Sequence, residues 1–329
     1  MNSIAQRALF ALITIVIIFG AVEAGLSMSG WPNADTTFDH NEPFWVVDPA
    51  LSGKSFPHKE EATSFLVSTN EDGLRAASAV PENKSSKHRI MTLGCSTTFG
   101  WGVADAETYP SRLQHYIDTA GVSNVEVING GQPGYTSFQG SWLWGNTLKH
   151  YNPDVVLIGY VVQDARKAAY TDKSQAILQK DSRFLKDNFL YRSKIYLALR
   201  SALGAVQIRA KERGTGDEGG VYRVPPQDYV ENLRGLISAI QSQGGRPILF
   251  GYPLERSGYT EKHRKILAAA AAELDVSIFD PQAQMETATR TGDYYFRNDR
   301  GHANGAGNDL IAQWVFEFLR DNSFLGASK

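Results

Sequence analysis

From residue 88 onward, short apolar runs alternate with segments in which apolar residues recur at helical spacing. The apolar runs have the length of strands buried on both faces: Arg89–Leu93, Val125–Asn129, Asp154–Val161, Pro247–Gly251 and Val276–Phe279. The other segments predict helices: Tyr109–Ala120, Phe138–His150, Asp228–Gln243, Glu261–Leu274 and Ala306–Arg320. This alternation predicts an α/β fold, a doubly wound, flavodoxin-like parallel sheet of about five strands with helices on both faces.

A different pattern opens the chain. Ala8–Val22 is an uninterrupted apolar run between Arg7 and Glu23. The run is about 15 residues long, or roughly 18 if Ala24, Gly25 and Leu26 are counted, and a full membrane span needs about 20. This length favours a single-pass anchor, with a cleaved signal peptide and a buried core helix as alternatives. Because the basic Arg7 precedes the run, we expect the following domain to lie outside the cytoplasm, anchored at the inner membrane or free in the periplasm after cleavage.

The predicted organisation has four parts. Residues 1–26 form the anchor or signal peptide, and residues 27–87 form a polar, proline-bearing lead-in or a small β appendage. Within this second part, Ser64–Ser68 predicts a strand. The α/β domain follows over residues 88–322, and residues 323–329 are a tail.

Composition excludes several classes of function. The net charge of −2 gives no indication of nucleic-acid binding. The single cysteine, Cys95, excludes an intrachain disulfide and a cysteine-based zinc site. No cofactor is expected, because the glycines around residue 100 form no dinucleotide-binding or Walker motif, and no metal is expected from one cysteine and scattered histidines. Six histidines are scattered without metal-ligand spacing, and we expect them at the surface: His40, His58, His88, His115, His150 and His263.

Two short motifs carry the chemistry. Ser96 lies directly after the first predicted strand, within Gly94-Cys95-Ser96-Thr97-Thr98-Phe99-Gly100. Asp299 and His302 share one turn just before the last predicted helix. A serine hydroxyl becomes a good nucleophile when an imidazole takes its proton, and a carboxylate can hold that imidazole in the required tautomer. The pair of motifs therefore predicts a serine-dependent acyl-transfer enzyme.

In combination and order, four segments resemble the blocks of the SGNH/GDSL hydrolase superfamily, over roughly residues 88–322. They are Gly94-Cys95-Ser96 with its tail to Gly102, Asn129–Ser137, Gly159–Asp164, and Asp299–His302 followed by Asn304 and Gly307. The resemblance implies that Ser96 is the nucleophile, His302 the base and Asp299 its orienting acid. It also implies an oxyanion hole made by the backbone N–H groups of Ser96 and Gly134 and by the side chain of Gln163.

The chain departs from that family at two positions. Cys95 replaces the usual aspartate before the serine, and Gln163 replaces an asparagine. The motifs and the departures together leave three possible functions. The expected substrate or ligand is an acyl ester of a lipid, a polysaccharide or a small molecule, and the expected location is the membrane. The first is an esterase outside the cytoplasm, and the second is an O-acyltransferase or O-acetyltransferase that modifies a polysaccharide. The third is a catalytically weakened binding module that retains the fold.

A basic insertion at about 165–220 interrupts the alternation of strands and helices. Residues 165–214 hold 12 lysines and arginines against 4 acids. Apolar residues at helical spacing predict an amphipathic helix, namely Ile195, Leu199, Leu203 and Val206, and residues 214–220 predict a glycine-rich loop. The insertion is either a lid that guides anionic substrates toward Ser96 or a solvated cap on the sheet.

Overall fold

The computed structural model describes residues 3–31, 38–39, 44, 46–76, 80–81, 87–177, 193–199 and 220–326. The chain forms two compact units. One consists of Met1–Thr36 and Gln175–Gly219, and the other of Thr37–Ser174 and Gly220–Lys329. The second unit contains the sheet and every site residue predicted from the sequence.

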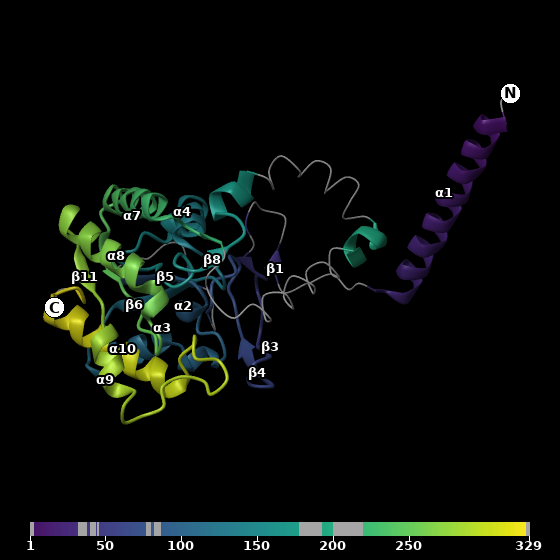
Figure 1. Ribbon diagram of the computed structural model, residues 1–329. Coiled ribbons are helices and arrows are strands. Elements are labelled where there is room, and N and C mark those ends of the chain that lie inside the picture. Colours follow the sequence, from purple (N-terminus) through teal and green to yellow (C-terminus); the bar gives the residue numbers. More distant parts are fainter. Residues whose placement is uncertain are drawn as a thin grey trace. The chain divides into compact units, whose positions relative to one another are not determined.

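A five-stranded parallel sheet forms the centre of the second unit (Figure 1). Its order is β11-β10-β7-β5-β6, which is the flavodoxin-like arrangement predicted from the sequence. The strands are β5 (His88–Gly94), β6 (Val125–Gly131), β7 (Val155–Gly159), β10 (Arg246–Phe250) and β11 (Ser277–Phe279). From β5 the chain adds β6 on one side and then β7, β10 and β11 on the other, so the strand order reverses between β5 and β7. A site is expected beyond the carboxyl ends of these two strands.

Helices cover both faces of the sheet (Figure 1). α3 (Tyr109–Thr119) packs beside α10 (Gly305–Asp321), and their apolar sides join the main core with Ile90 and Val155 of the sheet. α7 (Pro226–Gln241) packs between α4 (Ser137–Asn146) and α8 (Glu261–Glu273). All five predicted helices are present, although α4 ends early and continues as a 3-10 turn over Leu148–Tyr151. The sequence did not predict α9 (Gln282–Ala288).

An antiparallel hairpin precedes the sheet in the chain. It consists of β3 (Lys54–His58), which was not predicted, and β4 (Thr63–Val67), which confirms the predicted strand at Ser64–Ser68. Phe56, Phe65 and Val67 of the hairpin form a second small core with Phe99, which lies three residues after Ser96. The hairpin therefore packs directly against the segment that carries the serine.

Arg75 joins the hairpin to the same segment. Its guanidinium is buried and donates to the carbonyl oxygens of Phe99, Gly100 and Val103. It also donates to the carbonyl oxygen of Leu66 in β4. The Nε atom donates to Asp105 Oδ1 over 2.8 Å, so the charge is paired. These five donors fix the backbone that follows Ser96, because a guanidinium satisfies several carbonyls only in one arrangement.

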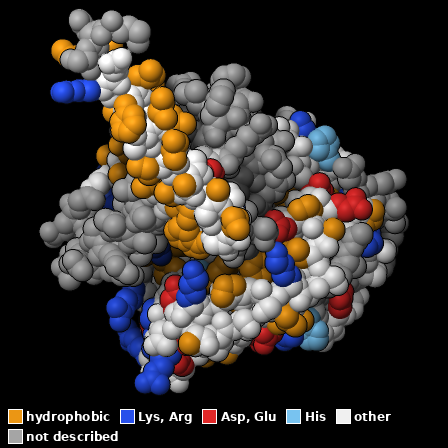
Figure 2. All heavy atoms as spheres, turned by 90° about the vertical axis from the view of Figure 1, so that its right-hand side faces the viewer, with side chains coloured by type: hydrophobic (Ala, Val, Ile, Leu, Met, Phe, Trp, Pro, Cys, Tyr) orange, Lys and Arg blue, Asp and Glu red, His pale blue; other side chains and the backbone are white. Residues whose placement is uncertain are grey.

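The first unit contains one long apolar helix, α1 (Ser3–Ser29). Within its 26-residue segment Ile4–Ser29, an 18-residue window has a mean hydropathy of 2.4, and the segment is long and apolar enough to cross a membrane. Figure 2 shows apolar side chains along this helix, and those from Ile4 to Phe19 are exposed. The helix extends well beyond the apolar run read from the sequence. Length and composition fit both an anchor and a signal peptide.

Most of the basic insertion lies outside the described residues. A short antiparallel pair, β8 (Lys167–Ala168) with β9 (Val221–Tyr222), brings its two ends together. Residues 194–199 are helical, which agrees with the predicted helix at Ile195 and Leu199. Its continuation at Leu203 and Val206 and most of the basic side chains fall outside the described residues. The lid hypothesis stays a prediction.

Candidate active site

Ser96 lies at the point where β5 ends and a single helical turn, α2 (Ser96–Phe99), begins. Two glycines allow this turn to lie against the sheet. A Cβ atom on Gly94 would stand 2.1 Å from Thr98 Oγ1, and one on Gly131 at the end of β6 would stand 2.4 Å from Phe99 N. Ser96 keeps 7% of its surface exposed, so its hydroxyl is nearly enclosed yet reachable.

Cys95 does not disturb this turn. Its backbone is extended (φ −93°, ψ −152°), as is usual for the residue before a helix. Its side chain is buried in the main core, with Sγ 3.3 Å from Thr97 Oγ1. The thiol therefore acts as a small packing group where the family has an aspartate.

Ser96, His302 and Asp299 form one chain of hydrogen bonds. His302 Nε2 lies 2.7 Å from Ser96 Oγ, and His302 Nδ1 lies 2.6 Å from Asp299 Oδ2. A carboxylate only accepts, so Nδ1 carries the proton and Nε2 is free to accept from the serine hydroxyl. The histidine is fixed in place because α10 starts three residues later, where the Asn304 side chain caps Gly307 N–H.

Asp299 is held by more than His302. Burial raises the pKa of this carboxyl, but the hydrogen bond and charge of His302, a hydrogen bond from His58 and one from the Gly301 N–H together lower it to about 2. The aspartate is therefore ionised throughout the range in which histidine changes its charge.

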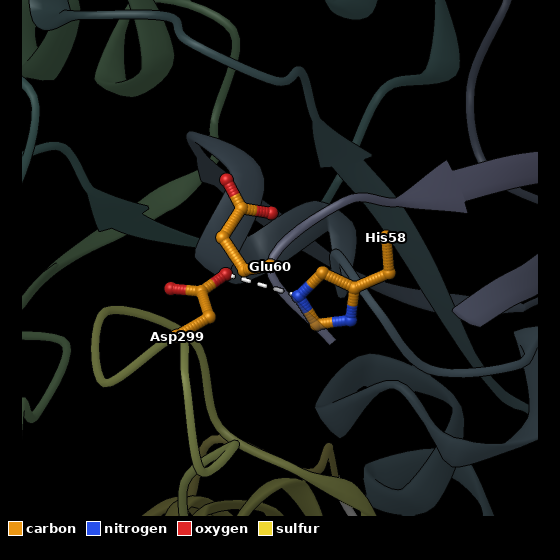
Figure 3. A group of neighbouring side chains, drawn as sticks. All are labelled: His58, Glu60 and Asp299. Atoms are coloured by element: carbon orange, nitrogen blue, oxygen red, sulfur yellow. Dashed lines mark hydrogen bonds and ion pairs between the residues drawn. The ribbon is translucent and has the colours of Figure 1, made fainter. Parts of the chain in front are cut away.

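The expectation that His58 and His263 lie at the surface is wrong. Both side chains are fully buried. His58 ends β3, where the alternation of the strand turns it inward, and its Nε2 lies 3.1 Å from Asp299 Oδ2 (Figure 3). His263 lies on the inner side of α8, with Nε2 2.9 Å from the Val224 carbonyl oxygen.

His58, Glu60 and Asp299 also form a group with the donor types of a metal site. Their potential ligand atoms lie within 4.8 Å of one another (Figure 3). The spacing between His58 and Asp299 is that of a hydrogen bond, and Asp299 Oδ2 already accepts a second hydrogen bond from His302. The geometry fits a hydrogen-bonded assembly around the aspartate.

Two of the three residues predicted for the oxyanion hole, Gly134 and Gln163, are joined by an arginine that sequence reasoning missed. Gly134 has a φ of 78° in the connection from β6 to α4, and Gln163 lies in the turn after β7. Arg223 Nη1 donates to the Gly134 carbonyl oxygen over 2.9 Å and to Gln163 Oε1 over 3.0 Å. Arg223 follows β9 at the end of the basic insertion, and no motif in the sequence marks it.

The other donors of Arg223 anchor it to the same region. Nε and Nη2 bind the two carboxylate oxygens of Asp172 over 2.9 and 2.8 Å. Asp172 in turn accepts a hydrogen bond from Thr136 Oγ1 over 2.8 Å, directly before α4. A bidentate pair of this kind fixes both the position and the orientation of the guanidinium. Arg223 is therefore a rigid support beneath Gly134 and Gln163.

Asp164, the neighbour of Gln163, is fully buried and accepts from the Ser137 N–H at the start of α4 over 2.9 Å. Burial raises the pKa of this carboxyl to about 6, and the hydrogen bonds from Ser137 and the charge of Arg223 oppose that rise. Asp164 thus links the turn after β7 to the N-terminus of α4. Ionisation of its buried carboxyl destabilises the folded state.

Comparison with known proteins places these residues in a family. The model of the GDSL-like Lipase/Acylhydrolase family matches residues 92–310, about two thirds of the chain. A multidomain esterase of Ruminococcus flavefaciens is 24% identical over 177 residues. That match covers 43% of this chain and 23% of the relative, so the chain spans less than a quarter of the relative's length.

Solved structures with a similar fold share little sequence with this chain. A lipase/acylhydrolase from Enterococcus faecalis is 18% identical with a TM-score of 0.49, over 71% of this chain and 96% of that one. An acetylxylan esterase from Geobacillus stearothermophilus is 17% identical with a TM-score of 0.46, over 75% and 98%. The match of the family model is the stronger finding. It confirms the resemblance read from the four sequence blocks and the expectation of an ester hydrolase at the level of the family: the chain belongs to the GDSL-like lipase/acylhydrolase family.

Proposed function

We propose that the protein is a serine esterase that cleaves an acyl ester through an acyl-enzyme. Ser96 Oγ attacks the carbonyl carbon while His302 Nε2 takes the hydroxyl proton, and His302 then gives that proton to the leaving alcohol. Water attacks the acyl-enzyme by the same route, which releases the acid and restores Ser96. The observation that carries this proposal is the hydrogen-bonded chain from Ser96 through His302 to Asp299, at 2.7 and 2.6 Å.

The oxyanion of the tetrahedral intermediate would be bound by the N–H groups of Ser96 and Gly134 and by the side-chain amide of Gln163. The Arg223 contact supports this role for glutamine. A guanidinium only donates, so it binds the amide oxygen of Gln163, and within the described residues the amide nitrogen keeps its donors for a ligand. The side chain of Gln163 can then donate a hydrogen bond to the oxyanion, as the family's asparagine does. This argues against a binding module that has lost catalysis.

The site of action is proposed to be the outer face of the inner membrane, with α1 as the anchor. The 26-residue apolar segment and the basic Arg7 near its start support this orientation. Extraction with alkaline carbonate tests the anchor directly: an anchored protein stays with the membrane pellet, and a cleaved one appears in the soluble fraction. Protease accessibility in spheroplasts reports the side on which the α/β domain lies.

Labelling with a fluorophosphonate tests the serine mechanism. The wild-type protein should form a covalent adduct at Ser96, and the Ser96→Ala variant should form none. A folded wild-type protein that hydrolyses no ester and takes no label would favour the binding module. Release of acetate from an acetylated donor, measured with and without a polysaccharide acceptor, separates hydrolysis from transfer. Appearance of the acetyl group on the acceptor would identify the transferase.

A further inference from the structure

We propose that His58 is a positioning residue for Ser96 and His302, acting through a second hydrogen bond to Asp299. The inference rests on the proposed esterase mechanism and adds a residue from outside the matched family region, which begins at residue 92. His58 Nε2 and His302 Nδ1 approach the same oxygen, Asp299 Oδ2, at 3.1 and 2.6 Å (Figure 3). One carboxylate oxygen thus serves two imidazoles.

The tautomer of His58 follows from its partner. Asp299 is an acceptor only, so Nε2 of His58 carries a proton and donates it to the carboxylate. Nδ1 is buried and has no hydrogen-bond partner within the described part of the chain. His263 Nδ1 is in the same state, so the feature that distinguishes His58 is the bond from its Nε2 to Asp299.

The packing around His58 prevents the ring from turning away. Phe296 meets it edge to face, with ring centroids 4.5 Å apart, and Phe65 contacts it from β4 at 6.3 Å. Gly102 lies against its other edge, where a Cβ atom would stand 2.8 Å from Nδ1. Among the described residues, the titratable groups recorded beside the His58 ring are Asp299, the exposed Glu60 and, beyond Asp299, His302.

The hairpin holds the loop of Asp299 at a second point as well. Glu61, in the turn between β3 and β4, accepts a hydrogen bond from the backbone N–H of Asn298 over 2.6 Å. The hairpin thus supports the backbone beside Asp299 and the carboxylate itself. Phe56, two residues before His58, packs with Phe99 in the small core beside Ser96. The hairpin contacts both ends of the serine–histidine–aspartate chain.

Sharing one oxygen has a chemical consequence. Each additional donor to a carboxylate withdraws electron density from it and weakens its hold on the other donors. His58 therefore fixes the direction of Asp299 and moderates its pull on the imidazole of His302. Loss of the donor should have two effects: a less well aligned base, which lowers kcat, and a stronger bond from Asp299 to protonated His302. The second effect should shift the acidic limb of the kcat/KM profile to higher pH.

The test compares variants with and without the donor in the full-length protein. His58→Phe and His58→Met remove the donor and retain bulk, whereas His58→Gln can place an amide N–H near the position of Nε2. We expect kcat to fall about tenfold in the first two variants with little change in KM, and the acidic limb to move up by about half a pH unit. His58→Gln should recover most of the rate. His263→Phe is the matched control, since His263 is equally buried but bonds only the Val224 carbonyl oxygen.

Two readouts separate the possible failures. Rates are measured with p-nitrophenyl acetate and as the second-order rate of fluorophosphonate labelling, which depends on the activation of Ser96 by His302 and on no natural substrate. A folded His58→Phe or His58→Met variant with wild-type kcat and an unshifted pH profile would overturn the role of His58. If the Ser96→Ala variant kept its activity, the proposed esterase mechanism itself would be wrong.

Discussion

Arg223 and Gln163 meet at one hydrogen bond, from Nη1 to Oε1 over 3.0 Å. The bond decides which end of the glutamine amide is available to a ligand, because the oxygen is occupied and the nitrogen has no hydrogen-bond partner among the described residues. The same Arg223 nitrogen also binds the Gly134 carbonyl oxygen. Two of the three groups assigned to the oxyanion hole therefore depend on a single guanidinium.

The first prediction concerns the glutamine. Gln163→Ala should lower kcat by about 100-fold and change KM much less, because an oxyanion donor acts mainly in the transition state. Gln163→Glu should be at least as poor, since both of its oxygens would accept from Arg223 and none would donate. Steady-state kinetics on a p-nitrophenyl ester measure both. A wild-type kcat in Gln163→Ala would mean that the side chain does not face the oxyanion.

Arg223→Lys should lower kcat by about tenfold, because an ammonium keeps the charge beside Asp172 but cannot bind Gly134, Gln163 and Asp172 together. If Arg223 acts through Gln163, the two substitutions should be non-additive. We therefore expect the double variant Arg223→Lys/Gln163→Ala to be much less than tenfold slower than Gln163→Ala alone, with the remaining loss arising from the Gly134 contact. Fully additive losses would assign Arg223 a separate role, such as contact with substrate.

Ser96→Ala and His302→Ala should each reduce esterase turnover by about 1,000-fold or more, and the double variant should be little worse than either. The reason is that the nucleophile and its base act as a unit. Ser96→Ala removes a single hydroxyl, and the His302 side chain is 18% exposed, so the melting temperature should change little in either variant. Retention of a tenth of wild-type turnover in Ser96→Ala would refute the serine mechanism.

Asp164 predicts a pH dependence of stability. Its pKa of about 6 in the folded chain exceeds its ordinary value of 3.8, so the folded state binds the extra proton between those values. Stability from this group is complete below about pH 4 and falls as the pH rises to about 6. The Asp164→Asn variant should not lose this stability as the pH rises. The difference between its free energy of unfolding and that of the wild type should therefore increase by on the order of 2–3 kcal/mol from pH 4 to pH 7. Urea denaturation at the two pH values measures the difference, and an unchanged difference would contradict the assignment.

Gly131→Ala should damage stability and activity together. The added Cβ would meet backbone atoms of Thr98 and Phe99 at 2.8 and 2.4 Å, and no side chain can move aside to relieve that contact. The turn that carries Ser96 would have to shift. Gly145→Ala is the matched control in α4, where the new methyl group meets nothing within 4 Å and should stabilise the helix by roughly 0.5–1 kcal/mol. Thermal melting and esterase assays distinguish the two variants, and equal behaviour would contradict the prediction.

The five sheet strands were predictable because each is a short apolar run that can be recognised from its own consecutive residues. Ser96, Asp299 and His302 could be found for a similar reason, since each lies in a short motif at the end of a predicted element. β3 could not be found, because Lys54–His58 contains a proline and only two inward positions.

The contacts of His58 and Arg223 were hidden for another reason. His58 is buried only because the hairpin packs on a loop that lies 241 residues further along the chain. Arg223 meets Gln163 across 60 residues, at the far end of an insertion whose composition indicates only a charged surface. Neither side chain has neighbours in sequence that reveal its role. Both roles depend on long-range contacts that a pattern of residues does not encode.

The distance between Ser96 and His302 along the chain, 206 residues, also has a consequence for biogenesis. A ribosome makes the proposed nucleophile before the proposed base, with four of the five sheet strands between them. A nascent chain can therefore fold β5 and β6 and present the serine, yet it has no imidazole to activate it until the segment before α10 has emerged. If Ser96 and His302 act as proposed, esterase activity would begin only after the segment that carries His302 has been made and folded against Ser96, and a partly synthesised copy would not hydrolyse the esters around it.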